Sequence, residues 1–314
     1  MQFLFVIDPL AELKAYKDTT VTMMRAAQAR GHGVFVCEQP GLAWRAGGVT
    51  AETTRIALAD SDEHWYRADR QARRRLAEFD AVLMRKDPPF DLEYVTSTWL
   101  LSAAEHEGAR VFNSPAALRD HNEKIAITEF PQFVAPTLVT RDPQQIHAFI
   151  DEQQDVVLKR LDVMGGENIF RVRGGDPNRN VIVEIMAQGG ARSVMAQRYI
   201  PEIVDGDKRV IIIDGEVVPY CLARIPKAGE SRGNLAAGAR GEARPLAVRD
   251  REIAQALGPV LAARGLLFVG LDVIGAWVTE VNVTSPTCFR EIHDQTGFDV
   301  AGMYIEALQK KLRT

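Results

Sequence analysis

The stretches FVGLDVI, residues 268–274, and TEVNVTSP, residues 279–286, follow one another near the carboxyl end of this 314-residue chain. The first is largely apolar, and in the second the neighbours of Glu280 and Asn282 on the other face are apolar, as in a strand that packs on a core. Glu280 and Asn282 lie two residues apart, so their side chains share one face of the second strand. Polar oxygens there are costly to bury unless a cation compensates them, and Mg²⁺ takes oxygen ligands and bridges phosphates. The pair therefore indicates a magnesium site.

Asp272, on the preceding strand, is a third candidate ligand. It joins the face of Glu280 and Asn282 only if the connecting loop has an odd number of residues, as in a three-residue loop at 275–277. The alternative is an exposed sheet face that carries ordinary polar residues. The pattern of the two strands alone leaves both interpretations open.

Strands and helices alternate in the first part of the chain. Apolar runs predict strands at residues 3–7, 33–38, 80–84 and 110–113. Helices are expected at residues 19–30, 61–77 and 91–107, the second with Trp65, Ala68, Ala72 and Leu76 on one face. Alternation of this kind predicts a parallel sheet covered on both faces, in a domain that ends near residues 120–123.

The pattern changes in the remainder of the chain. Shorter strands are predicted at residues 137–140, 156–159, 169–172 and 193–199, with helices near 143–153 and 177–188. Longer strands follow at residues 208–213, 217–223, 267–274 and 278–283, with helices near 249–264 and 300–312. Asp214-Gly215, between two of these strands, is a strong signal for a tight hairpin turn.

Composition and charge exclude several classes of protein. Hydrophobic residues make up 46% and charged residues 25%, and the net charge of −4 comes with no basic stripe, which argues against nucleic-acid binding. No apolar run approaches a membrane span, and the start MQFLFVID indicates a strand and not a signal peptide. Three separated cysteines, Cys37, Cys221 and Cys288, fit a reducing compartment. We therefore expect a cytoplasmic protein with neither nucleic-acid nor membrane partners.

No P-loop, GxGxxG, HExxH or GxSxG motif is present, so a nucleotide would require another scaffold. Lys159 ends an apolar strand, and the pair Gly165-Gly166 lies in the turn that follows. Glycines let backbone N–H groups approach phosphate oxygens, and a lysine adds a positive charge. The alternative is a plain hairpin with a lysine that reaches the solvent.

Residues 225–241, IPKAGESRGNLAAGARG, combine four glycines with Arg232 and Arg240 and have almost no large apolar residues. A loop of this length within a compact chain is usually functional. Arginines on a mobile lid suit a site where negative charge develops after closure. A disordered surface loop is the competing interpretation.

The segment MRKDPPFD, residues 84–91, follows the third predicted strand at its carboxyl end, where open α/β sheets bind ligands. Two prolines stiffen the turn, and Arg85 could bind a carboxylate through two hydrogen bonds. The alternative is a simple turn at the start of a helix.

Lys124, Lys159, the Met164-Gly165-Gly166 loop, Asp272, Glu280 and Asn282 resemble, in order and spacing, the nucleotide and metal apparatus of ATP-grasp ligases. Within that superfamily the chain resembles bacterial glutathione synthetases over nearly its whole length. The most specific matching segments are residues 84–91, 196–199, 205–209, 220–226, 232–238 and 282–287.

The resemblance implies an α/β chain with the ATP-grasp fold, built from three domains. An N-terminal parallel α/β domain would span residues 1–122, and a small central α+β domain that acts as a lid would span residues 123–200. A C-terminal α+β domain, residues 201–314, would carry the mobile loop 225–241.

The resemblance also implies a role for each candidate site residue. ATP would be bound by Lys124, Lys159, Gly165, Gly166, Gln197, Tyr199, Ile200 and Asp207. Mg²⁺, or alternatively Mn²⁺, would be held by Asp272, Glu280 and Asn282. Phosphoryl transfer would be assisted by Arg209, Arg224, Arg232 and Arg240. The dipeptide substrate would be bound by Arg85, Ser285, Pro286 and Thr287.

The implied reaction joins glycine to γ-glutamylcysteine. ATP would convert the cysteinyl carboxylate to an acyl phosphate, which the amine of glycine then attacks with release of ADP and phosphate. The family also implies a homo-oligomer, with a tetramer as one such assembly. Two alternatives remain open: another ATP-grasp carboxylate–amine ligase, such as a D-alanine–D-alanine or glutamate-adding enzyme, and a non-catalytic ATP-binding regulatory protein.

Overall fold

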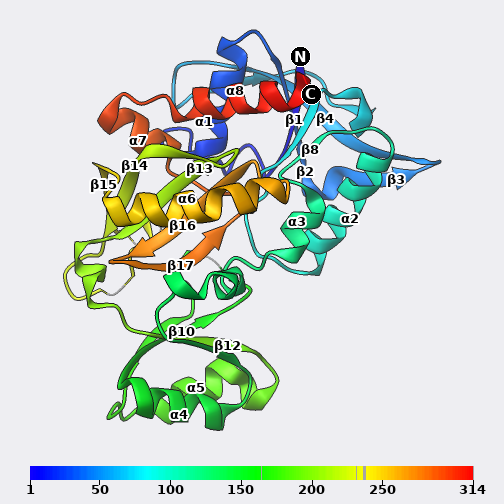
Figure 1. Cartoon of the computed structure of the whole chain (residues 1–314). Coiled ribbons are helices and arrows are strands. Elements are labelled where there is room, and N and C mark those ends of the chain that lie inside the picture. The colour runs from blue at the N-terminus through cyan, green and yellow to red at the C-terminus, as the bar shows by residue number, and fades with distance from the viewer. Residues whose placement is uncertain (164, 231, 236–237, 314) are drawn as a thin grey trace.

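The computed structural model describes residues 1–163, 165–230, 232–235 and 238–313. Met164 of the predicted glycine loop, Ser231, Ala236 and Ala237 of the loop 225–241, and Thr314 lie outside the described residues. The strands form three sheets of eight, four and five strands, which are arranged along the molecule as Figure 1 shows. Among the described residues, no helix combines the length and the hydropathy needed to cross a membrane.

The first sheet contains the predicted parallel strands. In spatial order they are β2 (Gly33–Glu38), β1 (Gln2–Ile7), β7 (Ala81–Met84) and β8 (Val111–Phe112). The associated helices are α1 (Thr19–Ala29), α2 (Leu92–His106) and α3 (Pro115–Asp120). The first two begin at aspartates whose carboxylates accept backbone N–H groups, Asp18 from Val21 and Asp91 from Tyr94.

The predicted helix at residues 61–77 is wrong. This region instead forms β5 (Tyr66–Ala68) and β6 (Ala72–Arg75), and both strands pair with the long strand β4 (Gly48–Leu58). β4 also pairs with β2 and with β3 (Leu42–Arg45). Ala68 and Ala72 of the expected helical face are exposed, so the helical spacing buried too little to compete with backbone pairing to β4.

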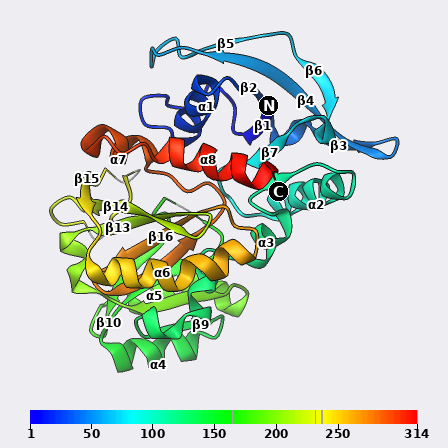
Figure 2. The ribbon, with the colours of Figure 1, turned by 45° about the horizontal axis from the view of Figure 1, so that its top comes forward.

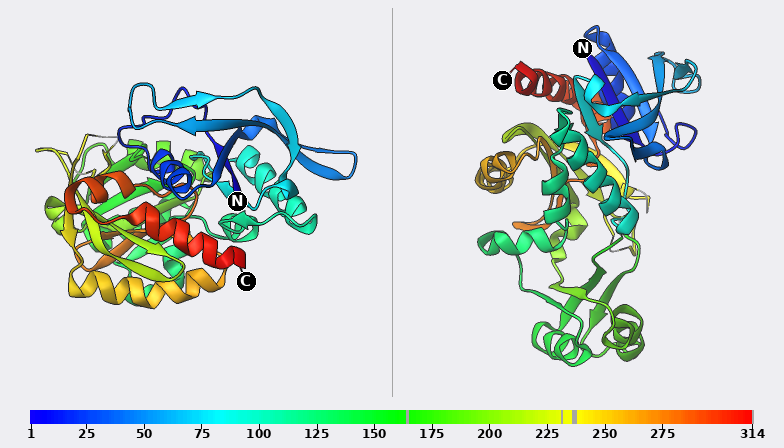
Figure 3. Two further views of the ribbon diagram at one scale, coloured as in Figure 1. Left: turned by 90° about the horizontal axis from the view of Figure 1, so that it is seen from above. Right: turned by 90° about the vertical axis from the view of Figure 1, so that its right-hand side faces the viewer.

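The second sheet forms a small unit at one end of the molecule, which the right panel of Figure 3 shows in profile. Its antiparallel strands are, in spatial order, β11 (Ile169–Arg173), β10 (Asp155–Arg160), β12 (Val194–Arg198) and β9 (Thr137–Thr140). Two helices pack on it, α4 (Pro143–Gln153) and α5 (Arg179–Ala187). These elements confirm the strands and helices predicted for this part of the chain.

The third sheet is antiparallel throughout. Its strands are, in spatial order, β15 (Arg240–Pro245), β14 (Glu216–Ile225), β13 (Asp207–Ile213), β16 (Phe268–Ile274) and β17 (Trp277–Asn282). The predicted hairpin turn is confirmed, since Asp214 and Gly215 have φ values of 50° and 83°. Val210 and Ile212 belong to the core that includes α6 (Val248–Ala263), whereas neighbouring Ile211 packs on the opposite face.

The opposite face of the third sheet contacts α7 (Phe289–Thr296) and α8 (Val300–Arg313). Figure 2 shows α8 lying beside α1, so the carboxyl end of the chain packs against the first unit, that is, the first sheet with its helices α1, α2 and α3. The 3-10 helices that lie wholly within the described residues are η1 (Gln39–Gly41), η2 (Leu76–Glu78), η3 (Ile125–Glu129), η4 (Pro131–Phe133), η5 (Gln188–Gly190) and η6 (Pro201–Asp205).

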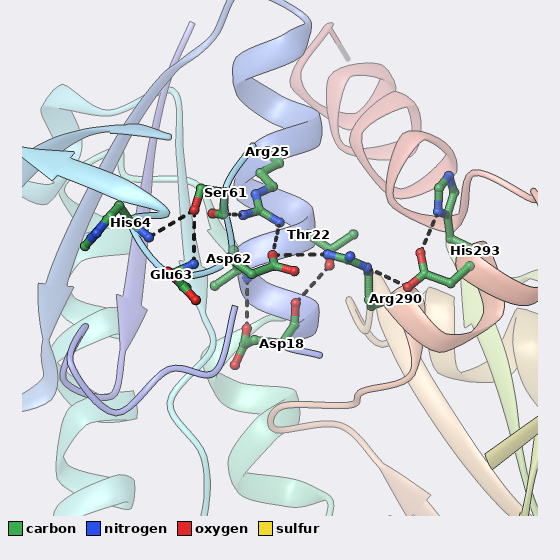
Figure 4. Close-up of polar contacts among 11 residues, drawn as sticks. Asp18, Thr22, Arg25, Ser61, Asp62, Glu63, His64, Arg290 and His293 are labelled. Atoms are coloured by element: carbon green, nitrogen blue, oxygen red, sulfur yellow. Dashed lines mark hydrogen bonds and ion pairs between the residues drawn. The ribbon is translucent and has the colours of Figure 1, made fainter. Parts of the chain in front are cut away.

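Polar contacts join the first and third sheets close to the end of β17. The side-chain amide of Asn113, which follows β8, donates to the carbonyl oxygens of Phe268 and Val283, both at 2.8 Å. Figure 4 shows a second junction, in which Asp62 accepts from Arg25 of α1 at 3.0 Å and from Arg290 of α7 at 3.5 Å. These contacts fix the start of α7 and the turn before it against the first sheet.

Candidate active site

A cavity of about 240 Å³ lies where the three sheets meet. Residues of β10, β11 and β12 form one wall and residues of β13, β14, β16 and β17 another, and the segment after β7 closes one end. All of the candidate site residues line this cavity except Arg85, Pro286 and Arg240. The fold thus brings together side chains that are distant in the sequence.

One end of the cavity has mixed apolar and polar walls that suit a nucleotide base. Lys159 of β10 donates from Nζ to Oε1 of Gln197, which lies on the neighbouring strand β12, at 2.9 Å. Burial lowers the pKa of Lys159. The ring of Tyr199 is covered by the guanidinium of Arg171, 3.4 Å from the ring centroid, and that guanidinium is itself held by Asp155.

The strands β16 and β17 carry the three candidate metal ligands, Asp272, Glu280 and Asn282, and we call this side of the cavity the metal face. The turn between them has two residues, 275 and 276, so the odd-numbered loop named as the condition for aligning Asp272 is not formed. A β-bulge with Thr279 as the extra residue nevertheless places Asp272 opposite Glu280. Asn282 is two residues further along, so all three candidate ligands share one face, as the magnesium hypothesis requires.

The acids of this region are paired with buried arginines. Asp272 accepts from Nε of Arg209 at 2.6 Å and lies 2.9 Å from Nη2 of Arg224, which also donates to Asp207 at 2.6 Å. Although burial opposes ionisation, the two guanidinium groups hold the pKa of Asp272 well below its usual range. Burial raises the pKa of Asp207 to about 6, and Arg224 opposes that rise.

Glu280 is paired with Lys124. Nζ of Lys124 lies 2.9 Å from Oε1 of Glu280 and donates to the carbonyl oxygen of Val163 at 2.7 Å. The amide nitrogen of Asn282 donates to Gly270, which leaves its amide oxygen available to a ligand. Within the described ranges no group of three His, Cys, Asp or Glu side chains could hold a metal. A cation here would thus be held by two carboxylates, the Asn282 amide oxygen and the phosphates of a bound nucleotide, an all-oxygen set that fits Mg²⁺.

The glycine loop and the segment after β14 meet over the cavity. Gly166 has a φ of 84°, and a Cβ added there would lie 2.6 Å from Oδ1 of Asn234. Nη1 of Arg232 donates to the carbonyl oxygen of Gly166 at 3.4 Å, while Nη2 pairs with Glu230 at 2.6 Å. The positive φ of Gly166, together with this close approach, favours glycine at position 166.

Two acidic residues at the other end of the cavity were missed by the sequence analysis. Glu123 is half-buried, and its Oε1 accepts from the backbone N–H groups of Val283 and Thr284 at 2.8 and 2.9 Å. Asp87 also lines the cavity. Both are adjacent to positions that the sequence did mark, Lys124 and the segment 84–91, but neither has a sequence signal of its own.

The expected direct roles of Arg85, Pro286 and Arg240 need correction, because the structure places their side chains outside the cavity. The guanidinium of Arg85 is buried and donates to Oγ1 of Thr20 at 3.1 Å and to the carbonyl oxygen of Pro286 at 2.8 Å. Arg240 begins β15 and pairs with Glu242, which lies two residues further along the same strand and on the same exposed face. Ser285 and Thr287, on either side of Pro286, do line the cavity.

Comparison with known proteins identifies the relatives of this chain. Residues 1–119 match a family described as prokaryotic glutathione synthetase, N-terminal domain, and residues 123–297 match prokaryotic glutathione synthetase, ATP-grasp domain. The glutathione synthetase of Bordetella parapertussis is 59% identical over 314 residues, which cover 98% of this chain and 99% of the relative. That of Ralstonia nicotianae is 56% identical over 310 residues, or 99% of this chain and 96% of the relative.

Solved structures support the same fold at much lower sequence identity. The D-cycloserine synthetase DcsG superposes with a TM-score of 0.69 at 17% identity, over 99% of each chain. The two family matches together span most of the sequence, and the full-length relatives share more than half of their residues with it. The chain therefore belongs to the prokaryotic glutathione synthetase family and has the ATP-grasp fold.

Proposed function

We propose that this chain makes glutathione from γ-glutamylcysteine, glycine and ATP, through an acyl phosphate of the cysteinyl carboxylate. The observation that carries the proposal is that one cavity contains both the metal face and four cations. These cations are Lys124, Lys159, Arg209 and Arg224. Ligation of a carboxylate to an amine at the expense of ATP requires such a meeting of phosphate-binding cations and a metal site.

The nucleotide would lie between the second and third sheets. Its base would lie against Gln197, Tyr199 and Ile200, and its phosphates would extend toward Lys159, Lys124 and the glycine loop. Lys124 and Lys159 are now bound to Glu280 and Gln197, respectively, so phosphate oxygens would replace these partners. The lowered pKa of Lys159 indicates that burial disfavours its charge, which an anionic ligand would favour again.

Asp272, Glu280 and Asn282 would hold Mg²⁺, and Mn²⁺ offers the same ligand chemistry. When bound, such a cation offsets the negative charge of the phosphates during phosphoryl transfer. Arg209 and Arg224 are fixed by Asp272 and Asp207, so their positions are set before the substrate arrives. Groups positioned in advance in this way stabilise developing charge without reorganisation.

The donor dipeptide would bind at the end formed by Ser285 and Thr287. Arg85 would act indirectly, because its hydrogen bond to Pro286 fixes the turn that carries these hydroxyl groups. Asp207 and Arg232 line the cavity, and Gly233 of the lid segment lies directly beside Asp207. Closure would exclude water, which would otherwise hydrolyse the acyl phosphate.

Three further features belong to the same proposal. Residues 1–122, 123–200 and 201–314 would form three domains, with residues 225–241 as a mobile lid. The chain would assemble as a homo-oligomer, for which a tetramer is the expected state. It would work in the cytoplasm on small molecules alone.

The proposal is tested by measuring ADP release with Mg²⁺ against a panel of dipeptides and amino acids. The combination of γ-glutamylcysteine and glycine is expected to give the fastest release. Faster release with D-alanine or with glutamate would indicate a different ATP-grasp ligase. No release with any pair would favour a regulatory protein that binds ATP.

A further inference from the structure

Asp87 occupies a position on the cavity wall that the reaction described so far leaves without a role. It follows β7, and within residues 84–91 it is Asp87 and Pro88 that line the cavity. Arg85, which the sequence marked as the carboxylate-binding residue of this segment, is buried and does not line the cavity. The group that this segment presents to a ligand is therefore a carboxylate and not a guanidinium.

The backbone of Asp87 is fixed on both sides. Its N–H donates to Oδ2 of Asp8 at 2.9 Å, and its carbonyl oxygen accepts from Nζ of Lys86 at 2.7 Å. Lys86 also pairs with Oδ1 of Asp8 at 2.8 Å. The backbone of Asp87 is thus held in place, while Lys86 is already paired with another acid.

The carboxylate itself lacks a cationic partner within the described part of the chain. None of the ion pairs there includes Asp87, and the guanidinium of Arg85 is directed to Thr20 and Pro286. Burial raises the pKa of Asp87, and a hydrogen bond from the side chain of Ser285 opposes the rise. A half-buried carboxylate without an ion-pair partner carries a desolvation cost, and a cationic ligand would offset that cost.

Of the substrates in the proposed function, γ-glutamylcysteine and glycine each carry a primary ammonium group. The position of Asp87 indicates which of the two it would bind. The amine of the acceptor must reach the acyl carbon next to the metal face, which is formed by Glu280 and Asn282. Asp87 instead follows β7 of the first sheet, and its backbone is bound by Asp8, which follows β1, and by Lys86. Asp87 therefore lies at the end of the cavity that the remote part of the donor would occupy.

We infer that Asp87 binds the α-ammonium group of the γ-glutamyl residue of the donor and so selects donors that carry this group. An ammonium has three N–H donors, and Ser285 and Thr287, whose hydroxyl oxygens can accept hydrogen bonds, also line the cavity. Binding the remote end in this way aligns the reacting carboxylate without obstructing it. The inference rests on the proposed function, since it concerns the donor of that reaction.

The test compares γ-glutamylcysteine with glutarylcysteine, which lacks only the α-ammonium group. Wild-type enzyme, Asp87→Asn, Asp87→Glu and Glu93→Gln are assayed for ADP release with both donors. Glu93→Gln is the matched control, because it removes an exposed carboxylate from the first turn of α2, outside the cavity. Loss of a charge-assisted contact is expected to reduce kcat/KM for γ-glutamylcysteine about 10- to 100-fold in Asp87→Asn.

The expected pattern has three parts. Wild type and Glu93→Gln prefer γ-glutamylcysteine over glutarylcysteine by a similar factor, Asp87→Asn loses that preference, and Asp87→Glu recovers part of it. The KM for glycine stays unchanged throughout. The inference is overturned if wild type does not discriminate between the donors, if Asp87→Asn still does, or if the substitution raises the KM for glycine instead. A wild-type enzyme that releases no ADP with γ-glutamylcysteine and glycine would refute the proposed function itself, and the inference with it.

Discussion

Asp272 lies opposite Glu280 in the β16–β17 hairpin because one extra residue, Thr279, shifts the register of the two strands. Each of the two carboxylates is held by cations, Asp272 by Arg209 and Arg224 and Glu280 by Lys124. Binding of a metal–nucleotide complex would therefore replace the Lys124–Glu280 pair with new ones, while Arg209 and Arg224 keep their contacts to Asp272 and Asp207, and no unpaired charge would have to be buried.

Glu280→Gln tests the metal face. The substitution keeps the shape of the side chain but removes a charge, so turnover is expected to fall by about 10² to 10³. The midpoint of thermal unfolding without ligands should change little, since Glu280 is partly exposed. The measurement is kcat as a function of Mg²⁺ concentration, and wild-type turnover at limiting Mg²⁺ would rule out Glu280 as a ligand.

Arg85→Ala tests the indirect role of this buried arginine. Without the hydrogen bond to Pro286, the turn that presents Ser285 and Thr287 should lose its position. A hydrogen bond from a charged group contributes about 1.5 to 3 kcal/mol, which corresponds to a rise in the KM for the dipeptide of about 10-fold or more. The KM for ATP should change much less. An equal rise in both constants would indicate general disruption of the cavity.

Limited proteolysis tests the lid. Trypsin is expected to cleave the free enzyme next to Lys227 or Arg232, and an ATP analogue with γ-glutamylcysteine should slow that cleavage. Cleavage at Arg70, which is exposed in the first unit away from the cavity, provides the control. If ligands leave the rate at Lys227 and Arg232 unchanged while binding is saturated, residues 225–241 do not close over the site.

The raised pKa of Asp207 gives a pH-dependent prediction. Its folded pKa of about 6 exceeds the ordinary value of 3.8, so folding takes up a proton between these values. The stabilising contribution of this group is thus present below pH 3.8 and is lost as the pH rises through 6. As the pH rises from 4.5 to 7.5, wild type should lose free energy of unfolding relative to Asp207→Asn, by on the order of 2 kcal/mol. A difference in unfolding midpoint that does not vary with pH would contradict this.

Much of the fold could be predicted from local pattern. The Asp214-Gly215 turn, the helix from Thr19, the strands of the second sheet and those of the third sheet other than β15 are each specified by residues within the element. The strands β5 and β6 could not be predicted, because they are determined by pairing with β4 and not by a pattern within their own residues. Tertiary pairing of this kind outweighs a weak helical spacing.

The candidate site divides in the same way. Glu280 and Asn282 could be paired from their spacing alone, but the alignment of Asp272 with them depends on a bulge that has no sequence signature here. Arg85 could be located at the end of a strand, whereas the direction of its side chain is set by Thr20 and Pro286, which are distant in the sequence. Sequence therefore marks which segments form the site but not which side chains face the ligand.

The most direct test is the mass of the product formed from ATP, γ-glutamylcysteine, glycine and Mg²⁺. The expected result is glutathione, formed in equal amount with ADP and only when all of the substrates are present. Omission of glycine should abolish formation of the tripeptide. A reaction in which no glutathione appears, while D-alanine or glutamate in place of glycine supports rapid ADP release, would contradict the assigned activity.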